Sequence, residues 1–393
     1  MTDQLFAQLH VPTRIVCAPG IARDFSTEWQ ALKVTRPLIV TDAGIVRAGL
    51  LAGVRDGLIA AGATIAAEFT DVPPNSELRV IESCAACARA NRADSVIAVG
   101  GGSVIDTAKL TAVLLTHGGD LLRDYAGAQT VPGALVPLVA IPTTAGTGSE
   151  VTQAAVVFDA ASGRKLSFVD ENLRPRLALL DPELTVGLPV LLTAATGMDA
   201  LTHAIEAFVD IQHSPLSDAL AVHAARLIRA SLLPALHNGN DVTARAQMLM
   251  AAALAGIAFD HSMVGVVHAL SHALGALAHV HHGTANAILL PIGLQYNWDA
   301  CLPRYAEFSR AVGVSSSSTD DATAAQSLVA WQSQLREQLF MRAKLPRTLA
   351  AAQIDRALIP QIVTLAIEDG ASFYNPRALE AEPLTELLET MWG

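Results

Sequence analysis

The sequence predicts an α/β domain with a parallel sheet, followed by a domain made only of helices. Short β-branched runs alternate with segments of helical period in the first half of the chain, and the period becomes helical almost throughout after about Thr185. The chain has 393 residues, of which 51% are apolar and 16% charged, so it is long enough for two separate cores. We therefore expect one domain at residues 1–185 and a second at residues 186–393.

Five segments in the first half have the pattern of buried strands, because each is short, continuous and bounded by Pro, Gly or Asp. They are residues 13–18, 37–42, 64–70, 95–100 and 135–141. Helix-length segments lie between them, at about residues 45–61, 76–92 and 103–116. This alternation predicts a parallel sheet covered by helices on both faces, with ligands bound at the carboxyl ends of its strands.

Two polar loops rich in glycine and hydroxyl side chains follow two of these strands. The first, GGGSVIDTAK at residues 100–109, joins three glycines, which let the backbone approach a ligand, to a helix N-terminus, which attracts anions. The second, PTTAGTGSEVT at residues 142–152, offers hydroxyl and backbone donors. Together they predict a nucleotide site. Ser103 and Asp106 also have the spacing of a helix capping box, so a purely structural role for both stays open.

Asp42 ends the second predicted strand, where an acidic side chain can accept from a ribose hydroxyl and favour NAD over NADP. A local turn held by this carboxylate is an equally good interpretation. Residues 152–159 and 164–170 flank a short turn and predict an antiparallel hairpin. Cys84 and Cys87 have C-x-x-C spacing, but without a second such pair one face of an amphipathic helix explains them better than redox or zinc chemistry.

Charge and composition exclude several classes of partner. The formal net charge is -11 and no segment is rich in Lys or Arg, which argues against nucleic acid or an anionic membrane surface. The N-terminus lacks the pattern of a signal peptide, and the longest apolar run, at residues 248–259, is too short to span a bilayer. We therefore expect a soluble, cytoplasmic protein that binds a small molecule.

Histidine is concentrated in one apolar stretch, because six of the 12 histidines lie within residues 261–282. Imidazole is the commonest protein ligand for Zn, Fe, Cu and Ni. Asp199 and His203 are four residues apart, which places both on one face of a helix, and His268 and His272 repeat that spacing. One carboxylate and three imidazoles suit Fe(II) or Zn(II). Spacing alone does not decide which histidines bind the ion.

These segments resemble the iron-containing (group III) alcohol dehydrogenases, and the resemblance runs nearly end to end. The matching segments are GGGSVIDTAK (100–109), PTTAGTGSEVT (142–152), GMDALTHAIEAF (197–208), HSPLSD (213–218), HALSHALGA (268–276), HGTANAILLP (282–291) and YNPR (374–377). The resemblance implies a Rossmann-like dinucleotide-binding domain and an all-helical C-terminal domain, the dehydroquinate synthase-like architecture. It also implies an active site in the cleft between the two domains, and a homodimer or higher homo-oligomer.

Carried over position by position, the resemblance implies a role for each matching residue. The implied metal ligands are Asp199, His203, His268 and His282. The implied contacts to the cofactor are Asp42, Asn75, Gly101, Gly102, Ser103, Asp106, Thr143, Thr144, Thr147 and Lys165. His272 would lie beside the nicotinamide and the substrate as a catalytic residue, without being a required ligand.

The reaction implied by the resemblance is reversible hydride transfer between a short-chain primary or secondary alcohol, or its aldehyde or ketone, and NAD (EC 1.1.1). An Fe(II) ion, or Zn(II), would polarise the substrate oxygen, and NADP is the less expected cofactor. One alternative is a metal-independent NAD(P)H reductase of the maleylacetate reductase type, which the intact set of ligands disfavours. The other is a non-catalytic module that senses NAD or metal. No residue identifies the alcohol.

Overall fold

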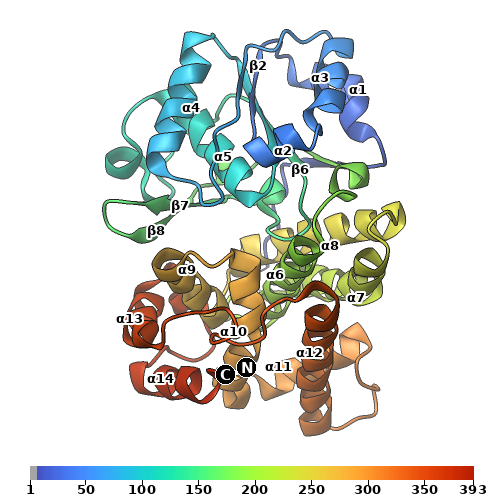
Figure 1. Ribbon diagram of the computed structural model, residues 1–393, viewed down its shortest axis with the longest axis vertical. Coiled ribbons are helices and arrows are strands. Elements are labelled where there is room, and N and C mark those ends of the chain that lie inside the picture. Colours follow the sequence, from blue (N-terminus) through green and yellow to red (C-terminus); the bar gives the residue numbers. More distant parts are fainter. Residues whose placement is uncertain (1–6) are drawn as a thin grey trace. The chain divides into compact units, whose positions relative to one another are not determined.

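The computed structural model describes residues 7–393, and contacts within the chain divide it into two units (Figure 1). The α/β unit consists of residues 11–188 and 239–253. The helical unit consists of residues 189–238 and 254–393, with the N-terminal stretch that ends at His10. Helix α8 (Val242–Ser262) therefore belongs to the α/β unit in its first half and to the helical unit in its second half.

The α/β unit is built on a six-stranded sheet with the strand order β1-β9-β6-β4-β2-β3, in which every pair is parallel. Its strands are β1 (Arg14–Cys17), β2 (Pro37–Val40), β3 (Ala67–Phe69), β4 (Ser95–Gly100), β6 (Leu138–Pro142) and β9 (Leu177–Leu180). The parallel sheet and its five predicted strands are confirmed. The sixth strand, β9, comes from a segment for which no strand was predicted.

Helices cover both faces of this sheet, because successive side chains of a strand point to opposite faces. In the central strand β4, Ile97 and Val99 pack with α1 and α3, whereas Val96 and Ala98 pack with α4 and α5. Figure 1 shows these two pairs of helices on opposite sides of the strands. The helices are α1 (Ser26–Leu32), α3 (Leu51–Ala60), α4 (Leu78–Ala90) and α5 (Gly102–His117). Burial on both faces explains why this strand is apolar throughout rather than alternating.

The single helix predicted at about residues 45–61 is wrong, because two helices occupy this segment. They are α2 (Ala43–Arg47) and α3, and Gly49 separates them with a φ of 71°. This left-handed conformation, which glycine adopts without steric strain, follows the end of α2 and redirects the chain into α3.

The predicted hairpin is confirmed as the antiparallel strands β7 (Ala154–Asp159) and β8 (Arg164–Val169). Together with β5 (Gly127–Ala128) they form a second, three-stranded sheet of the α/β unit. The C-x-x-C pair lies on α4, as expected for one face of a helix. Burial raises the pKa of the Cys84 thiol to about 12, so this thiol is a poor nucleophile.

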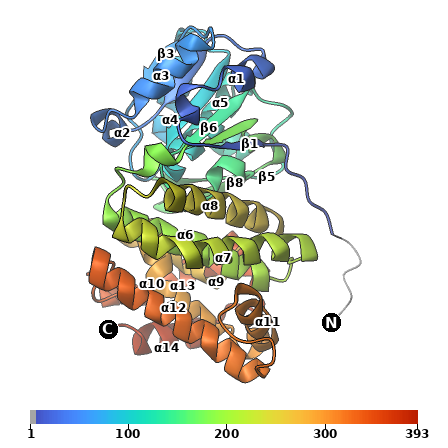
Figure 2. The same ribbon diagram turned by 90° about the vertical axis from the view of Figure 1, so that its right-hand side faces the viewer.

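The helical unit contains no strand among its described residues, which confirms the all-helical C-terminal region. Besides the end of α8, its helices are α6 (Val190–Val209), α7 (Pro215–His237), α9 (Val266–Ala278), α10 (His282–Tyr296), α11 (Trp298–Val312), α12 (Asp321–Ala343), α13 (Ile359–Glu368) and α14 (Ala381–Thr390). Figure 2 shows α6 and α7 running side by side. Helices α6, α9 and α10 are buried around most of their circumference, which their runs of Ala, Leu and Gly permit.

Two helices, α7 and α8, are long and apolar enough to cross a membrane by length and composition alone. The apolar run at residues 248–259 is only part of α8. The run by itself is therefore too short to span a bilayer, whereas the whole helix is long enough. In the most apolar window of α8, however, 61% of the residues are buried inside the protein, and in that of α7 44% are buried. Core helices pass the same test of length and composition, so the two helices are weak evidence for a membrane span.

Candidate functional site

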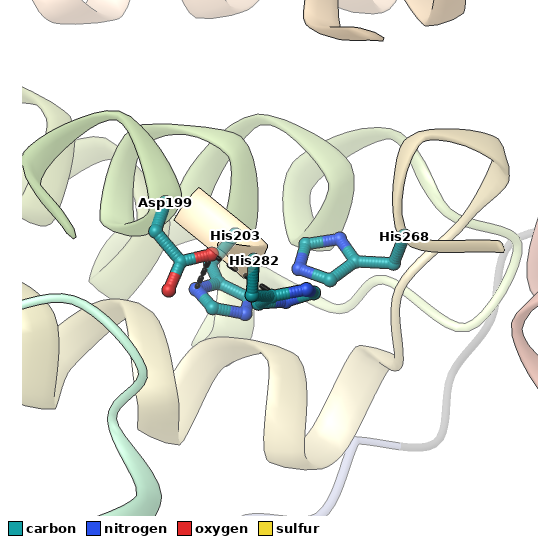
Figure 3. Close-up of side chains that lie close together, drawn as sticks. All are labelled: Asp199, His203, His268 and His282. Carbon is teal, nitrogen blue, oxygen red and sulfur yellow. Dashed lines mark ion pairs between the residues drawn. The ribbon is translucent and has the colours of Figure 1, made fainter. Parts of the chain in front are cut away.

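Four side chains of the helical unit converge on one point (Figure 3). They are Asp199 and His203 from α6, His268 from α9, and His282 from the first turn of α10. One carboxylate oxygen or imidazole nitrogen from each lies within 4.8 Å of those of the other three. The first three residues are buried and His282 is partly exposed. The structure thus brings together the four residues that the resemblance implied as metal ligands.

The geometry of this four-residue cluster follows from helix spacing and ring packing. Asp199 and His203 are one helical turn apart on α6, with Oδ1 and Nδ1 4.0 Å from each other. The His203 ring stacks between Phe259 of α8 and His268, with ring centroids 4.4 Å away on each side. His282 Nε2 lies 3.6 Å from Asp199 Oδ1. These contacts hold the cluster within the apolar interior of the helical unit.

The His268 ring is oriented by a buried carboxylate that the sequence reasoning missed. Glu206 Oε2 lies 2.5 Å from His268 Nδ1. The same carboxylate accepts hydrogen bonds from the backbone N–H groups of Gly265 and Val267, at the start of α9. The Glu206 carboxylate acts as the acceptor toward His268 Nδ1. The ring proton is therefore on Nδ1, and Nε2 presents its lone pair. A metal-binding histidine is usually held by such an outer partner.

Burial raises the pKa of Glu206 to about 7, although the N–H groups of Gly265 and Val267 lower it. Glu206 is 4% exposed, on a helix that otherwise buries Ala, Ile, Phe and Val around it. An acidic residue one turn after His203, inside an apolar helix, is the sequence signal that could have identified it.

His282 is oriented in the same way from the other side. Its Nδ1 lies 3.1 Å from Ser271 Oγ, and this hydroxyl also donates to the His282 carbonyl oxygen at 3.4 Å. Because the hydroxyl donates to the carbonyl, it accepts from Nδ1–H, which leaves the lone pair of His282 Nε2 for the interior of the cluster. Two imidazole lone pairs and a carboxylate therefore converge, a donor set that fits a divalent Fe(II) or Zn(II) ion.

His272 lies beside this cluster but is not among its four members. Its ring stacks on that of His282, with centroids 5.6 Å apart and an interplanar angle of 15°. Its Nδ1 lies 2.9 Å from Oδ2 of Asp369, a second partner that the sequence reasoning missed. The pKa of Asp369 lies below its usual value. Burial raises this pKa, but the contacts with His272 and the Ala371 N–H group lower it by more. His261, also outside the cluster, contacts the Ile257 carbonyl oxygen and the His10 N–H group.

In the α/β unit, the two predicted nucleotide loops lie against each other. A Cβ atom added to Gly101 would lie 3.3 Å from Thr144 Oγ1, and one added to Gly102 would lie 2.8 Å from Thr147 Cγ2. The backbone N–H group of Thr143 donates to the Gly100 carbonyl oxygen. A larger residue at either glycine would therefore crowd the side chains of the second loop.

Ser103 and Asp106, two of the predicted cofactor residues, have structural partners within the protein. Ser103 does not cap α5, because the N-cap is Gly101; its hydroxyl donates instead to the Pro74 carbonyl oxygen, next to Asn75. This corrects the capping-box interpretation. Both carboxylate oxygens of Asp106 have a protein donor, with Oδ1 2.6 Å from Ser149 Oγ and Oδ2 3.0 Å from the Val156 N–H group. Asp106 therefore clips the second loop to α5.

Asp42 caps α2, since its Oδ1 accepts from the N–H groups of Gly44 and Ile45 at 2.7 and 3.0 Å. The structural interpretation of this residue is therefore observed, and contact with a ribose stays a prediction. Lys165 lies half-buried on β8. Burial raises the pKa of the Asp106 carboxyl, and the charge of Lys165 offsets part of that rise.

Comparison with known proteins covers nearly the whole chain. A family model described as iron-containing alcohol dehydrogenase matches residues 12–182, and one described as Fe-containing alcohol dehydrogenase family, C-terminal, matches residues 193–392. The 1,3-propanediol dehydrogenase of Klebsiella pneumoniae is 37% identical over 379 residues, which are 96% of this chain and 96% of the relative. The NAD-dependent methanol dehydrogenase of Bacillus methanolicus is 34% identical over 379 residues, 96% of this chain and 98% of the relative.

A solved structure, alcohol dehydrogenase from Oenococcus oeni, superimposes with a TM-score of 0.93 at 32% identity and covers 98% of this chain and 100% of its own. The two-part fold that the sequence predicts is thus found in a solved relative that matches this chain nearly end to end.

Substitution of Gly283 tests how far the four-residue cluster depends on close packing of α10 against α6. A Cβ atom there would lie 2.4 Å from the Ala195 carbonyl oxygen and 3.3 Å from Asp199 Cβ, so Gly283→Ala must push α10 away from α6. We expect this variant to lose about 1–3 kcal/mol of unfolding free energy in urea titrations. It should also bind a divalent ion more weakly in calorimetry, because His282 moves with Gly283.

Gly187→Ala is the matched control for this substitution, because a Cβ atom there meets no heavy atom of the described residues within 4 Å apart from its chain neighbours. It should change the unfolding free energy by less than about 1 kcal/mol. A Gly283→Ala protein that unfolds at the same urea concentration as the control would show that α10 and α6 are not constrained at this point.

Proposed function

The chain belongs to the iron-containing alcohol dehydrogenase family, and we propose that it catalyses reversible hydride transfer between a short-chain alcohol and NAD. The observation that carries this proposal is the convergence of one carboxylate and three imidazoles within 4.8 Å. The substrates in the names of the relatives, methanol and 1,3-propanediol, support a small alcohol or its aldehyde or ketone.

We assign the metal to Asp199, His203, His268 and His282, with Fe(II) as the expected ion and Zn(II) accepted by the same donors. When bound, such an ion supplies Lewis acidity toward the substrate oxygen. The protein contributes orientation, since Glu206 and Ser271 hold the two Nδ1 atoms and direct Nε2 of His268 and His282 inward. The buried surroundings also limit access of water, which strengthens electrostatic interactions within the site.

We assign proton exchange to His272. Its Nδ1 faces the carboxylate of Asp369, an acceptor, so Nδ1 holds the ring proton and Nε2 is left to accept or return a proton. The carboxylate fixes the orientation of the ring, as an orienting acid does beside a catalytic histidine.

We assign NAD to the two loops of the α/β unit, with Gly101, Gly102 and Ser103 at the start of α5 beside the phosphates. The packed loops and the N-terminus of a 16-residue helix support this assignment, because helix N-termini attract phosphate. The further contacts proposed are Asp42, Asn75, Asp106, Thr143, Thr144, Thr147 and Lys165. Residues 1–185 as the cofactor domain, residues 186–393 as the metal domain, a cytoplasmic location and a homo-oligomer also remain proposals.

Two alternatives differ from this proposal in testable ways. A metal-independent reductase of the maleylacetate reductase type would need no ion, although the complete four-residue cluster is unexplained in that case. A non-catalytic module that senses NAD or metal would bind both without turnover. Measuring alcohol oxidation with and without the ion separates all three functions.

Metal removal is the experiment that tests the function. Protein treated with a chelator and then dialysed should lose alcohol oxidation with NAD by more than about 100-fold, because Lewis-acid stabilisation is worth several kcal/mol. Adding Fe(II) should restore it, measured as NADH formation over a panel of short alcohols and diols. Full turnover by protein with no detectable metal would favour the reductase, and binding without turnover would favour the sensing module.

Substitution of two histidines one turn apart should separate binding of the ion from catalysis. His268→Ala should lose metal and activity together. His272→Ala should keep the metal content of the wild type and lower kcat by about 100-fold, the usual contribution of a general acid or base. Metal content by elemental analysis and steady-state rates decide the outcome. Loss of metal from both variants would make His272 a ligand.

Asp42 can be tested without losing its capping role. Asp42→Ser removes the charge but keeps a side chain that caps α2, whereas Asp42→Ala removes both and should destabilise the protein by about 1 kcal/mol. If the carboxylate faces the ribose, both variants should raise kcat/KM for NADP relative to NAD by about 10-fold or more, because a like charge no longer opposes the 2′-phosphate. A wild-type preference for NADP would contradict this role.

A further inference from the structure

We infer that Asn286 is a positioning residue of the metal centre, whose amide group keeps the ligand atoms assembled by donating to Asp199. This inference rests on the proposed function, since it concerns the same ion. Asn286 lies on α10, four residues after His282, and is fully buried. Helix spacing therefore places its side chain on the same face as that ligand.

The amide nitrogen of Asn286 contacts three of the four ligand residues. Nδ2 lies 2.6 Å from Asp199 Oδ1, 3.2 Å from His268 Nε2 and 3.4 Å from His282 Nε2. All three atoms are acceptors, because Glu206 and Ser271 fix the protons of the two rings on Nδ1. Buried acceptors that face one another repel unless a donor lies between them. The Asn286 amide provides that donor.

The other end of the carboxamide serves no visible purpose in the fold. Asn286 Oδ1 is buried and has no hydrogen-bond partner among residues 7–393. An asparagine used to hold two helices together would have its oxygen paired as well as its nitrogen. Here every polar partner of the side chain is a residue of the proposed metal site. These contacts indicate that the side chain serves to orient the ligand atoms rather than to hold helices together.

The hydrogen bond to Asp199 is compatible with a bound ion. An imidazole nitrogen has a single lone pair, which an ion would take from the amide. A carboxylate oxygen has two, so Asp199 Oδ1 can face an ion and still accept from Asn286. The amide thus orients the carboxylate in both states and relieves repulsion when the ion is absent. Such outer partners typically change metal affinity by about 10–100-fold.

The test measures ion binding rather than activity. Metal-free wild-type, Asn286→Ala and Asn286→Leu proteins are titrated with Co(II), following calorimetry and the visible spectrum. Asn286→Leu fills the space of the amide without its donor, so it separates the hydrogen bond from the cavity. Both variants should still bind one ion, with an affinity lower by about 10–100-fold and a shifted visible spectrum, because the Asp199 carboxylate is no longer oriented.

Gln332→Ala is the matched control, because Gln332 is also a fully buried carboxamide whose oxygen lacks a hydrogen-bond partner among the described residues. Its amide contacts Ser333 on α12 instead of a ligand residue. It should bind Co(II) like the wild type. Equal affinity and spectrum in the wild type and both Asn286 variants would overturn the inference. A wild type that binds no Co(II) would instead overturn the proposed metal site itself.

Discussion

Several electron-rich atoms converge in the interior of the helical unit, and its local structure depends on keeping them together. A carboxylate and imidazole lone pairs repel one another when water is excluded. The protein offsets this repulsion by fixing each ring from outside, through Glu206 for His268 and Ser271 for His282, and by placing the Asn286 amide among the acceptors. Removing any one of these partners leaves buried charge or lone pairs without compensation, which is more destabilising than losing an exposed contact.

Most of the fold could be predicted from the sequence because its signals are local. Runs such as residues 95–100 are apolar throughout, which a strand buried on both faces requires. The break between α2 and α3 was missed, because a glycine in a helical pattern is often tolerated and only the chain direction shows that Gly49 is left-handed. Strand β9 was missed because its residues, Leu177–Leu180, carry little β-branched signal.

The site was predictable only in part, and the limit has a physical cause. Asp199 and His203 are four residues apart on one helix, so their spacing in the sequence predicts that they lie close together. The contact of Glu206 with His268 joins residues 62 positions apart, and that of His272 with Asp369 joins residues 97 apart. No periodicity encodes such pairs. The matching family segments pointed to the ligands, while the side chains that orient the rings became visible only in three dimensions.

Helix α9 carries His268, yet its first turn is held by residues made much earlier and much later. Glu206 accepts from Gly265 and Val267, and Asn375 Oδ1 accepts from the Val266 N–H group at 3.1 Å. On the ribosome, Glu206 emerges long before Asn375, so until Asn375 is made the first turn of α9 is held through Glu206 without its second acceptor. The start of α9, the helix that carries His268, is therefore completed only when the chain is nearly finished.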